Sequence, residues 1–318
     1  MDNGQNDIGI AAVLGSTGFV GRALCDEIVG HGWKVLRIRS PRLLATMQRE
    51  GSLYVEFDEF EGIIGELVSR FEGVNVVVNA AGLARPSGRD VSTLFGANAL
   101  LPIIVGEAFR RSGVERFIHV SSASVQGDSE TLDESDNYSA TTTYAQSKAL
   151  GEQRLLAAST PGVTILRPTS VHGPDRRLTQ QLARFARSPL SSVMAPGENP
   201  TPQVLNTNVA AVVSFLCRVP SNPPPIVLQP WEGWTTSSFL RVLSGRQPRQ
   251  VPQGFATASL RMTAMLSKLF PVRAQHRRLE ILWIGQKQSP GWLESVGYRT
   301  VHGSEEWESL ARTLSTTE

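Results

Sequence analysis

The sequence predicts an α/β fold in which helices cover both faces of a parallel sheet, and three observations lead to this prediction. Short apolar runs alternate with helical patterns through the first half of the chain. One run, Val74–Val78, is almost all valine, which is typical of a strand buried on both faces. Helix-stopping residues, such as Gly113 and Pro161, follow the helical segments.

The elements of the first half follow from this alternation in chain order. We expect strands at Ile8–Leu14, Lys34–Arg39, Leu53–Phe57, Val74–Val78, Phe117–Ser121 and Val163–Leu166. We expect helices at Gly21–Gly30, Ile63–Phe71, Leu94–Ser112 and Thr143–Ser159.

The pattern changes after Pro168, where Pro and Gly become frequent. Ser188–Pro202 and Pro220–Pro230 have the composition of loops. Helical patterns occur at Leu178–Ala186, Val209–Cys217, Ser237–Leu243 and Ala256–Phe270. We therefore expect a first domain over residues 1–175 and a small helical region over 176–318. That region caps the carboxyl edge of the sheet, and part of its chain returns to the sheet.

Composition limits the classes of function. The net charge of +2 over 318 residues gives no strong field for nucleic acid or an acidic membrane surface. Two cysteines, no signal peptide and no apolar stretch of membrane-spanning length predict a reduced, cytoplasmic protein. The five histidines are scattered, so we expect no metal site. Of the 31 cationic residues only four are Lys, and Arg supplies the rest.

A glycine-rich segment links the first expected strand to the first helix. It consists of Gly15, Ser16, Thr17, Gly18, Phe19, Val20 and Gly21. Glycine at the first position permits a tight turn, at the second a close approach of backbone to phosphate, and at the third close packing of helix on sheet. The helix N-terminus adds N–H groups and a positive dipole end. This segment predicts a dinucleotide site.

The end of the second strand predicts which dinucleotide binds. An NAD site usually has an acidic residue there for the ribose 2′-hydroxyl, whereas this chain has Arg39 followed by Ser40. Because Arg pairs bidentately with phosphate, we expect NADP, with NAD as the alternative. Asp58, after the third expected strand, is a candidate acceptor for the adenine amino group.

Tyr144 and Lys148 lie four residues apart on an expected helix and therefore share a face. A nearby ammonium stabilises a phenolate and lowers the pKa of the phenol, as an acid–base catalyst at neutral pH requires. Ser122 and Ser124 follow the strand that precedes this helix and place hydroxyls at the carboxyl edge of the sheet. Together these residues predict proton transfer at a carbonyl or hydroxyl.

Over about its first 175 residues the chain resembles the extended short-chain dehydrogenases/reductases, the family of sugar-nucleotide epimerases, dehydratases and reductases. The resemblance rests on the glycine segment, Asp58, the Asn79-Ala80-Ala81-Gly82 run, Asn98, the serine run from Val120 to Gly127, Tyr144 with Lys148, and Leu166–Pro174. It implies a Rossmann-like, doubly wound sheet and NAD(P)-dependent chemistry.

The resemblance also implies roles for single residues. Tyr144 is the expected acid–base, Lys148 the ligand of the nicotinamide ribose, and Ser122 the hydrogen-bond donor to the reacting oxygen, with Ser124 as helper. Asn98 is the expected support of a proton relay. The expected cofactor contacts further include Asn79, Ala80, Ala81, Gly82, Pro168 and Val171. Family members often dimerise through the helices containing Asn98 and Tyr144, so we expect a homodimer.

The substrate-binding half resembles the family less specifically. The expected substrate contacts are Arg85, Gln126, His172, Asn208 and Arg278. Gln126 and His172 stand where the family commonly has Tyr, and Thr201 stands where a diphosphate-binding Arg is frequent. The resulting hypothesis is an NADP(H)-dependent reductase of a keto group, C4 foremost, of a nucleotide-linked sugar.

Three other functions stay open. They are an epimerase or dehydratase with tightly held NAD(P), a reductase or dehydrogenase of a sterol-like or other apolar alcohol, and a non-catalytic NADP sensor. The complete Ser–Tyr–Lys set argues against the sensor. The Met- and Leu-rich helix Ala256–Phe270 bears on the apolar alternative, since it can line an apolar substrate site, dock on a membrane or pack as core. Of these, packing as core is the interpretation we favour.

Overall fold

The computed structural model describes residues 9–45, 53, 55–84, 91–269 and 280–316. The chain divides into two compact units. Unit 1 consists of Met1–Gly127, Glu134–Pro168 and Val209–Gln229, and unit 2 of Asp128–Asp133, Thr169–Asn208 and Pro230–Glu318. The main boundary therefore lies at Pro168, and a later segment returns to unit 1.

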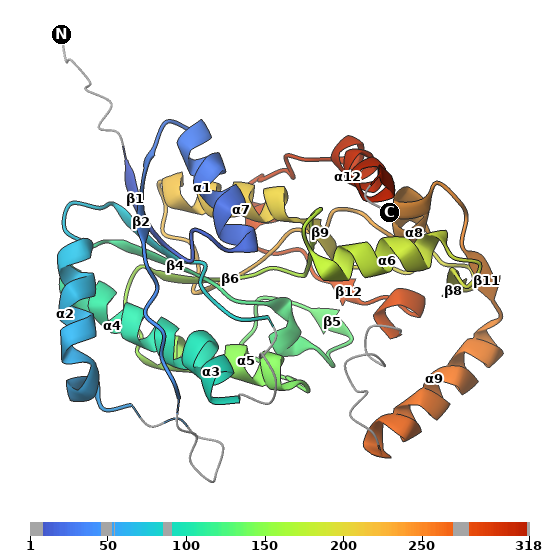
Figure 1. Ribbon diagram of the computed structural model, residues 1–318, viewed down its shortest axis with the longest axis horizontal. Helices are drawn as coiled ribbons and strands as arrows, with labels where there is room; N and C mark the ends of the chain where they lie inside the picture. The colour runs from blue at the N-terminus through green and yellow to red at the C-terminus, as the bar shows by residue number, and fades with distance from the viewer. Residues whose placement is uncertain (1–8, 46–52, 54, 85–90, 270–279, 317–318) are drawn as a thin grey trace. The chain divides into compact units, whose positions relative to one another are not determined.

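Unit 1 is built on a six-stranded parallel sheet with the strand order β10-β6-β4-β3-β1-β2 (Figure 1). The strands are β1 (Ile10–Leu14), β2 (Lys34–Ile38), β3 (Val76–Asn79), β4 (Arg116–Val120), β6 (Val163–Arg167) and β10 (Ile226–Leu228). The chain runs from β1 outward to β2, and then returns to β3 on the other side of β1. This reversal confirms the predicted doubly wound α/β fold, in which the ligand crevice lies at the carboxyl ends of the strands.

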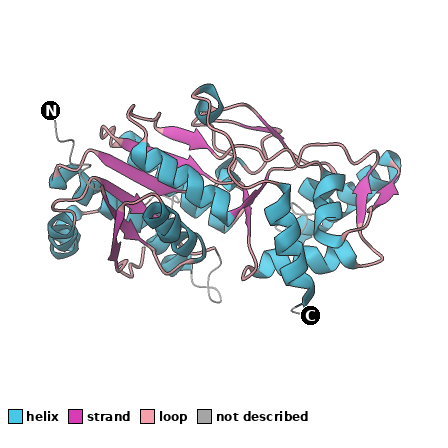
Figure 2. Cartoon of the chain, turned by 90° about the horizontal axis from the view of Figure 1, so that it is seen from above, coloured by secondary structure: helices cyan, strands magenta, loops and turns pink. Residues whose placement is uncertain are grey.

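Helices cover both faces of this sheet. Figure 1 shows α1 (Phe19–Gly30) and α7 (Asn206–Arg218) on one face, and α2 (Glu61–Arg70), α4 (Leu101–Ser112) and α5 (Thr143–Ala157) on the other. Figure 2 shows the strands running between the helices. Val77, Phe117 and Ile165 of the strands are fully buried, because both faces of the sheet are covered.

The predicted strand Leu53–Phe57 is wrong for the residues that the structure describes. Leu53, Val55 and Glu56 are in neither helix nor strand, and Phe57–Phe60 is a 3-10 helix. The apolar side chains of Leu53 and Val55 pack in the core of unit 1 instead. The Leu53 carbonyl accepts a hydrogen bond from Arg154 at 2.8 Å. A side chain of helix α5 therefore supplies the hydrogen bond that a neighbouring strand would otherwise supply.

The predicted loop Pro220–Pro230 is also wrong in part, because β10 lies within it and pairs with β6. β10 is an edge strand, so its backbone pairs with a neighbouring strand on one side only. Prolines, which lack an N–H group to donate, are therefore compatible with the segment before it. Pro225 still contributes its carbonyl oxygen, which accepts from the Ile165 N–H at 2.8 Å.

The long apolar helix predicted from Leu94 begins earlier and contains an irregular turn. It runs through α3 (Val91–Phe95), a π-helical turn η2 (Gly96–Leu100) and α4. The stretch Val91–Ser112 is long and apolar enough to cross a membrane, contrary to the sequence expectation, but 67% of its apolar 18-residue window is buried inside the protein. It is therefore placed as a core helix of unit 1.

Unit 2 has a core of its own. Helices α6 (Arg177–Arg187), α8 (Thr236–Ser244) and α12 (Ser304–Thr316) pack together around Trp307, which is fully buried. Three two-stranded parallel pairs accompany them, namely β7 (Ser170–His172) with β9 (Gln203–Leu205), β8 (Ser192–Met194) with β11 (Arg249–Val251), and β5 (Thr131–Leu132) with β12 (Lys287–Gln288). A short helix, α11, spans Trp292–Ser295.

Helix α9 (Gln253–Leu269) does not pack as the sequence led us to expect. Ala256 and Leu260 are buried, but Phe255, Met262 and Met265 are 66%, 62% and 65% exposed. The core interpretation of the predicted helix Ala256–Phe270 is therefore wrong for Met262 and Met265 and confirmed for Leu260, and Phe255 lies just before the predicted range.

Candidate active site

Five of the strands of unit 1 end at one edge of the sheet, and each is followed by a predicted site segment. Gly15 follows β1, Arg39 follows β2, Ala80 follows β3, Ser121 follows β4 and Pro168 follows β6. Since the strands are parallel, these segments all lie at the carboxyl edge. The edge therefore brings the predicted cofactor and catalytic segments together.

The glycine segment is packed too tightly for side chains at two positions. Gly15 has a φ of 77°, and a Cβ there would lie 2.5 Å from the Ala81 nitrogen. A Cβ on Gly21 would lie 2.0 Å from the Gly15 carbonyl oxygen, so helix α1 can approach the loop only without a side chain there. Gly18 is the N-cap of α1, and the helix has no side-chain cap. The positive end of the α1 dipole thus lies at the glycine segment, where it favours an anion.

Three polar atoms near the same edge are buried without a hydrogen-bond partner in the described structure. They are Ser40 Oγ, Asn79 Nδ2 and Ser121 Oγ, which lie just beyond or at the ends of β2, β3 and β4. A buried polar group without a partner is unfavourable unless a ligand or water satisfies it. Together with the glycine segment, these atoms fit a polar cofactor lying across the strand ends.

The serines after β4 form a turn that is held by hydrogen bonds. Ser122 is the N-cap of the 3-10 helix η3 (Ala123–Gln126), and its Oγ lies 2.9 Å from Ser124 Oγ. The Ala123 N–H donates to the Pro168 carbonyl at 2.8 Å, which ties the turn to the end of β6. Both serines are half-buried, so their hydroxyls are held in place but remain reachable.

Tyr144 and Lys148 lie on helix α5, which packs against the serine turn. Thr142 caps this helix by accepting from the Ala145 N–H, and this fixes its first turn where Tyr144 lies. Lys148 is 4% exposed and donates to the Val120 carbonyl at 3.0 Å, at the end of β4. That is its one hydrogen bond to the described chain, so two of its three N–H groups remain for a ligand or for Tyr144.

Burial lowers the pKa of Lys148 to about 8, and the negative charge of Glu152 opposes this effect. The ammonium form thus persists at neutral pH but loses its proton more readily than an exposed lysine does. Among the lysines whose side chains the structure describes, Lys148 is buried, whereas Lys34 and Lys287 are exposed. This agrees with the distinct role that the sequence predicts for it.

Asn98 connects three segments of the site. Its Oδ1 accepts from the Leu83 N–H at 2.9 Å, and its Nδ2 donates to the Leu83 carbonyl and to Ser147 Oγ at 2.8 and 3.0 Å. It lies on the π-turn η2, and α5 approaches closely here because a Cβ on Gly151 would lie 2.5 Å from the Asn98 carbonyl. Asn98 thus orders the segment after β3 and the helix that carries Tyr144.

A buried ion pair behind the site was not predicted. Arg167 Nη2 lies 2.7 Å from Glu152 Oε2, and both side chains are 0% exposed. Arg167 also donates to the Ser135 carbonyl at 2.6 Å and stacks over the Tyr138 ring. The available signal was the position of Glu152, four residues after Lys148 on the same helix face.

His119 of β4 is a second buried polar residue that the sequence reasoning missed. Desolvation lowers the pKa of its fully buried ring, and the charge of Lys148 lowers it further. His119 is therefore neutral at physiological pH. A neutral ring adds no positive charge beside Lys148, whose ammonium it would otherwise repel.

The model of the NAD dependent epimerase/dehydratase family matches residues 11–202. That is more than half of the chain, and it includes every predicted catalytic residue named above. The chain belongs to this family. It is an NAD(P)-dependent enzyme of the extended short-chain dehydrogenase/reductase type, and its cofactor is a nicotinamide dinucleotide.

Two curated relatives are reductases. The chain is 30% identical over 222 residues to ceramide reductase of Caulobacter vibrioides, covering 67% of this chain and 62% of the relative. It is 28% identical over 219 residues to 2-alkyl-3-oxoalkanoate reductase of Stenotrophomonas maltophilia, covering 64% and 63%. The chain thus matches somewhat less than two thirds of the length of these relatives.

Solved structures share the fold over nearly the whole chain. MoeE5 in complex with UDP-glucuronic acid and NAD matches with a TM-score of 0.63 and 19% identity, covering 98% of this chain and 100% of that one. A dTDP-4-dehydrorhamnose reductase from Bacillus anthracis in complex with NADP matches with a TM-score of 0.61 and 13% identity, covering 95% and 97%. At these identities the likeness establishes the fold alone.

Three residues that were predicted to contact the cofactor or the substrate lie in other surroundings than the sequence led us to expect. Asp58 is exposed in the 3-10 helix, since the strand that was to carry it is absent among the described residues. Gln126 is buried, and its amide lies 3.3 Å from Ser135 Oγ. Val171 is buried in β7 of unit 2. Their contacts with ligands stay predictions, and Arg85 and Arg278 lie outside the described residues.

His172 and Asn208, the other predicted substrate residues, are engaged inside unit 2. His172 is fully buried, its ring nitrogens lie 2.7 Å from Gln203 Oε1 and 3.1 Å from Thr179 Oγ1, and burial lowers its pKa to about 3. Asn208 donates to Glu232 Oε1 at 2.6 Å and to the His302 carbonyl at 2.9 Å. These side chains hold unit 2 together, and the hydrogen bonds do not support the substrate contacts predicted for them.

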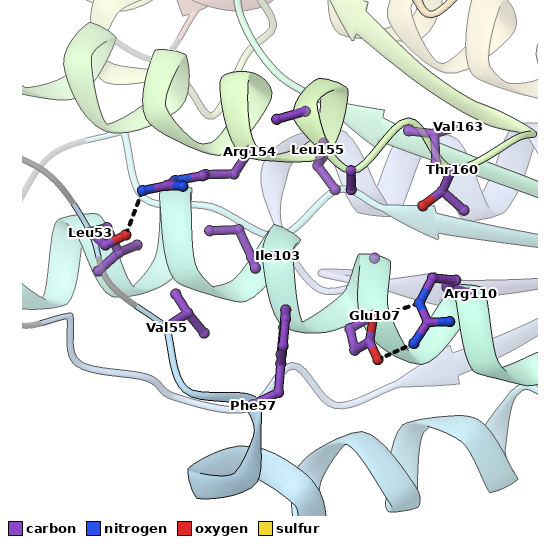
Figure 3. Close-up of a pocket in the computed structure, with 13 residues that line it drawn as sticks. Leu53, Val55, Phe57, Ile103, Glu107, Arg110, Arg154, Leu155, Thr160 and Val163 are labelled. Carbon is purple, nitrogen blue, oxygen red and sulfur yellow. Dashed lines mark hydrogen bonds and ion pairs between the residues drawn. The ribbon is translucent and has the colours of Figure 1, made fainter.

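A cavity of about 470 Å³ lies elsewhere in unit 1, between residues 53–57 and helices α4 and α5 (Figure 3). Leu53, Val55, Phe57 and Ile103 give it apolar walls, and the paired Glu107 and Arg110 lie at one end. None of the predicted catalytic residues lines it. The cavity is thus separate from the site at the strand ends.

Proposed function

We propose that this protein is an NADP(H)-dependent oxidoreductase that interconverts a ketone and a secondary alcohol on an apolar substrate. The observation that carries the reaction type is the placement of the Ser122 turn and the Tyr144–Lys148 helix at the end of β4. The apolar substrate is supported by relatives whose names specify ceramide and an alkyl-oxoalkanoate.

A bound nicotinamide supplies or accepts the hydride at the reacting carbon. In the reducing direction, Ser122 Oγ donates a hydrogen bond to the carbonyl oxygen. Tyr144 passes its phenolic proton to that oxygen as negative charge develops there. The Lys148 ammonium stabilises the resulting phenolate, while Ser147 and Asn98 hold α5 in register.

The preference for NADP rests on the end of β2. Arg39 is exposed there and can approach a 2′-phosphate, and the unpartnered Ser40 Oγ can hydrogen-bond the same group. The sequence has no carboxylate at this position, which an NAD-specific site would use for the ribose. NAD is the alternative cofactor.

Reduction of a nucleotide-linked sugar at C4, the hypothesis that the sequence favoured, becomes the second candidate. It is supported by the Val204–Ala210 segment, which resembles the corresponding segment of the family. The internal hydrogen bonds of His172 and Asn208 weaken it, because those side chains were to contact the sugar. An epimerase or dehydratase differs from both reductase candidates in consuming no NADPH overall.

The two candidates are separated by NADPH oxidation, followed by absorbance, with a 2-alkyl-3-oxoalkanoate and with dTDP- and UDP-linked 4-keto sugars. We expect turnover with the alkyl ketone and little with the sugars. Turnover confined to the sugars would reverse the order of the candidates. Conversion of a sugar without net NADPH loss would establish an epimerase or dehydratase instead.

The acid–base role is tested by Tyr144→Phe, which removes only the phenolic oxygen. We expect kcat to fall by about three orders of magnitude while NADPH affinity, measured by fluorescence titration, stays within twofold. Tyr138→Phe is the matched control, since it keeps the ring that stacks on Arg167 and should retain turnover. Full activity in Tyr144→Phe would remove Tyr144 from the mechanism.

A further inference from the structure

Helix α9 of unit 2 presents an apolar stripe away from its buried side. Each residue of an α-helix advances by about 100° around the axis, so Phe255, Ala258, Met262 and Met265 fall within about 80° of one another. All four are exposed, and the three large ones are at least 62% exposed. Single exposed apolar side chains are ordinary, but a stripe over three turns is a feature of binding surfaces.

The buried residues of α9 face another direction. Ala256 and Leu260, four residues apart, are 0% and 6% exposed. On the same 100° rule they lie roughly 100° or more from the centre of the apolar stripe. Figure 1 shows α9 starting beside β11 and running away from α6, α8 and α12 of its unit. The stripe is therefore not needed for the packing of unit 2.

The stretch of sequence that contains this helix carries charge of one sign. Residues 233–279 contain no Asp or Glu, although the chain as a whole has about one carboxylate per eleven residues, 29 in 318. The same stretch has eight Arg and Lys residues, so a chain of net charge +2 has a net charge of −6 outside it (2 − 8). Arg241, Arg246, Arg249 and Arg261 of this stretch are exposed in the structure.

We propose that α9 docks this protein on the surface of an anionic phospholipid bilayer. Phe255, Met262 and Met265 insert at the boundary between headgroups and acyl chains, and the exposed arginines of residues 241–261 contact lipid phosphates. An apolar stripe flanked by cationic residues without carboxylates is the composition of interfacial helices. Unpaired arginines near an anionic leaflet gain electrostatic attraction, which salt screens.

The same charges disfavour a second copy of the chain as the occupant. In a two-fold dimer across this face, Arg261 of each copy would approach the other copy's cationic surface. No carboxylate of residues 233–279 is available to compensate it. An anionic lipid surface supplies that compensation, so it matches both the apolar and the charged parts of the face. The proposal does not depend on which substrate the enzyme reduces.

Flotation of the full-length protein with vesicles tests the proposal, using phosphatidylcholine alone and phosphatidylcholine mixed with phosphatidylglycerol. We expect binding to the mixed vesicles at low salt, several-fold weaker binding at high salt, and little binding to phosphatidylcholine alone. Absence of binding to the mixed vesicles at low salt would overturn the proposal. Equal binding to both kinds of vesicle would overturn the electrostatic part of it.

The stripe itself is tested by the double variant Met262→Gln, Met265→Gln, which removes apolar surface without changing charge. We expect its partition onto mixed vesicles to fall at least about tenfold. Val301→Gln is the matched control, because Val301 is 61% exposed in unit 2 but lies outside α9, and its binding should be unchanged. Equal losses in both variants, or none in the double variant, would contradict the assignment of the stripe.

Two further measurements on the double variant distinguish other uses of the face. NADPH oxidation with a short, water-soluble ketone should equal that of the wild type, whereas a parallel loss would assign α9 to the substrate site. Analytical ultracentrifugation in the absence of lipid should give the same mass for both proteins. A wild-type dimer that the double variant abolishes would assign the face to self-association.

Discussion

At the residue scale, Lys148 is the residue on which the properties of the site depend most. It is a buried cation with one hydrogen bond to the described chain, it lies one helical turn beyond Tyr144, and burial lowers its pKa. Burying a charge is costly, so a buried lysine does not favour stability by itself, and this supports the role proposed for Lys148. Its pKa of about 8 places its titration within an accessible pH range.

The activity should therefore decline as the pH rises through about 8, because Lys148 loses its charge there and no longer stabilises the Tyr144 phenolate. Glu152→Gln removes a negative charge that raises the pKa of Lys148, so the alkaline limb should move to lower pH. The measurement is the pH dependence of kcat/KM. Lys287→Met, which removes an exposed lysine, should leave the profile unchanged. An alkaline limb that stays in place in Glu152→Gln would argue against this origin.

At the same scale, the proposed preference for NADP depends on Arg39. Arg39→Asp should shift the ratio of kcat/KM for NADPH over NADH toward NADH by at least tenfold, since a carboxylate repels the 2′-phosphate and accepts from the 2′-hydroxyl. Arg70→Asp makes the same change of charge on helix α2, away from the strand ends, and should not alter the ratio. An unchanged ratio in Arg39→Asp would remove this residue from the cofactor site.

At the element scale, close backbone packing places the helices where the site needs them. Helix α1 can approach β1 because Gly21 has no side chain to meet Gly15. Helix α5 can approach the π-turn because Gly151 has none to meet Asn98. The buried Glu152–Arg167 pair then ties α5 to the end of β6. A buried pair is costly to break from one side, by about 3–5 kcal/mol, so it fixes the position of the helix that carries Tyr144.

The packing of α1 gives a paired test within one helix. Gly21→Ala should reduce dinucleotide affinity at least tenfold and destabilise the protein, because its Cβ would lie 2.0 Å from the Gly15 carbonyl. Gly30→Ala, in the same helix, has nothing within 4 Å of its new Cβ and should be neutral or slightly stabilising. Calorimetric titration with NADPH measures the first effect and urea unfolding the second. Similar behaviour of the two variants would contradict the packing argument.

At the scale of the whole molecule, the chain separates its tasks between two units. The segments at the carboxyl strand ends of the sheet, with the predicted catalytic residues, belong to unit 1. Unit 2 contributes a separate aromatic core around Trp307 and the exposed face of α9. A homodimer through the helices containing Asn98 and Tyr144 stays a prediction. Residues of α4 and α5, which belong to those helices, also line the cavity of unit 1.

Binding of the cofactor should stabilise the folded chain by mass action. At an NADPH concentration one hundred times Kd, the gain is about 2.7 kcal/mol if only the folded state binds. We expect the thermal midpoint to rise with NADPH concentration in the wild type, as followed by circular dichroism. The midpoint of Gly21→Ala should respond much less. No rise in the wild type would mean that the folded chain does not bind NADPH.

The sequence by itself determined the fold class, the order of the main strands and helices, and the residues that gather at the strand ends. These follow from local information: apolar period, glycine spacing and the four-residue separation of Tyr144 and Lys148. The short strands of unit 2 were not predicted, and β8 lies in the segment Ser188–Pro202 that was expected to be a loop. In the main sheet the strand ends were predicted to within two residues, apart from β10 and the absent strand at Leu53–Phe57. In those two segments, pairing across the sheet and packing on α4 and α5 outweighed local composition.

Only the tertiary structure decided which polar and apolar side chains are buried. His172 and Asn208 form internal hydrogen bonds in unit 2, Arg167 pairs with Glu152 across fifteen residues, and Met262 and Met265 face outward. Burial depends on neighbours that are distant in the sequence, and neither residue type nor helical period specifies those neighbours. The residues of the candidate site could thus be proposed from the sequence, whereas their supporting contacts and the exposed face of α9 became apparent only in three dimensions.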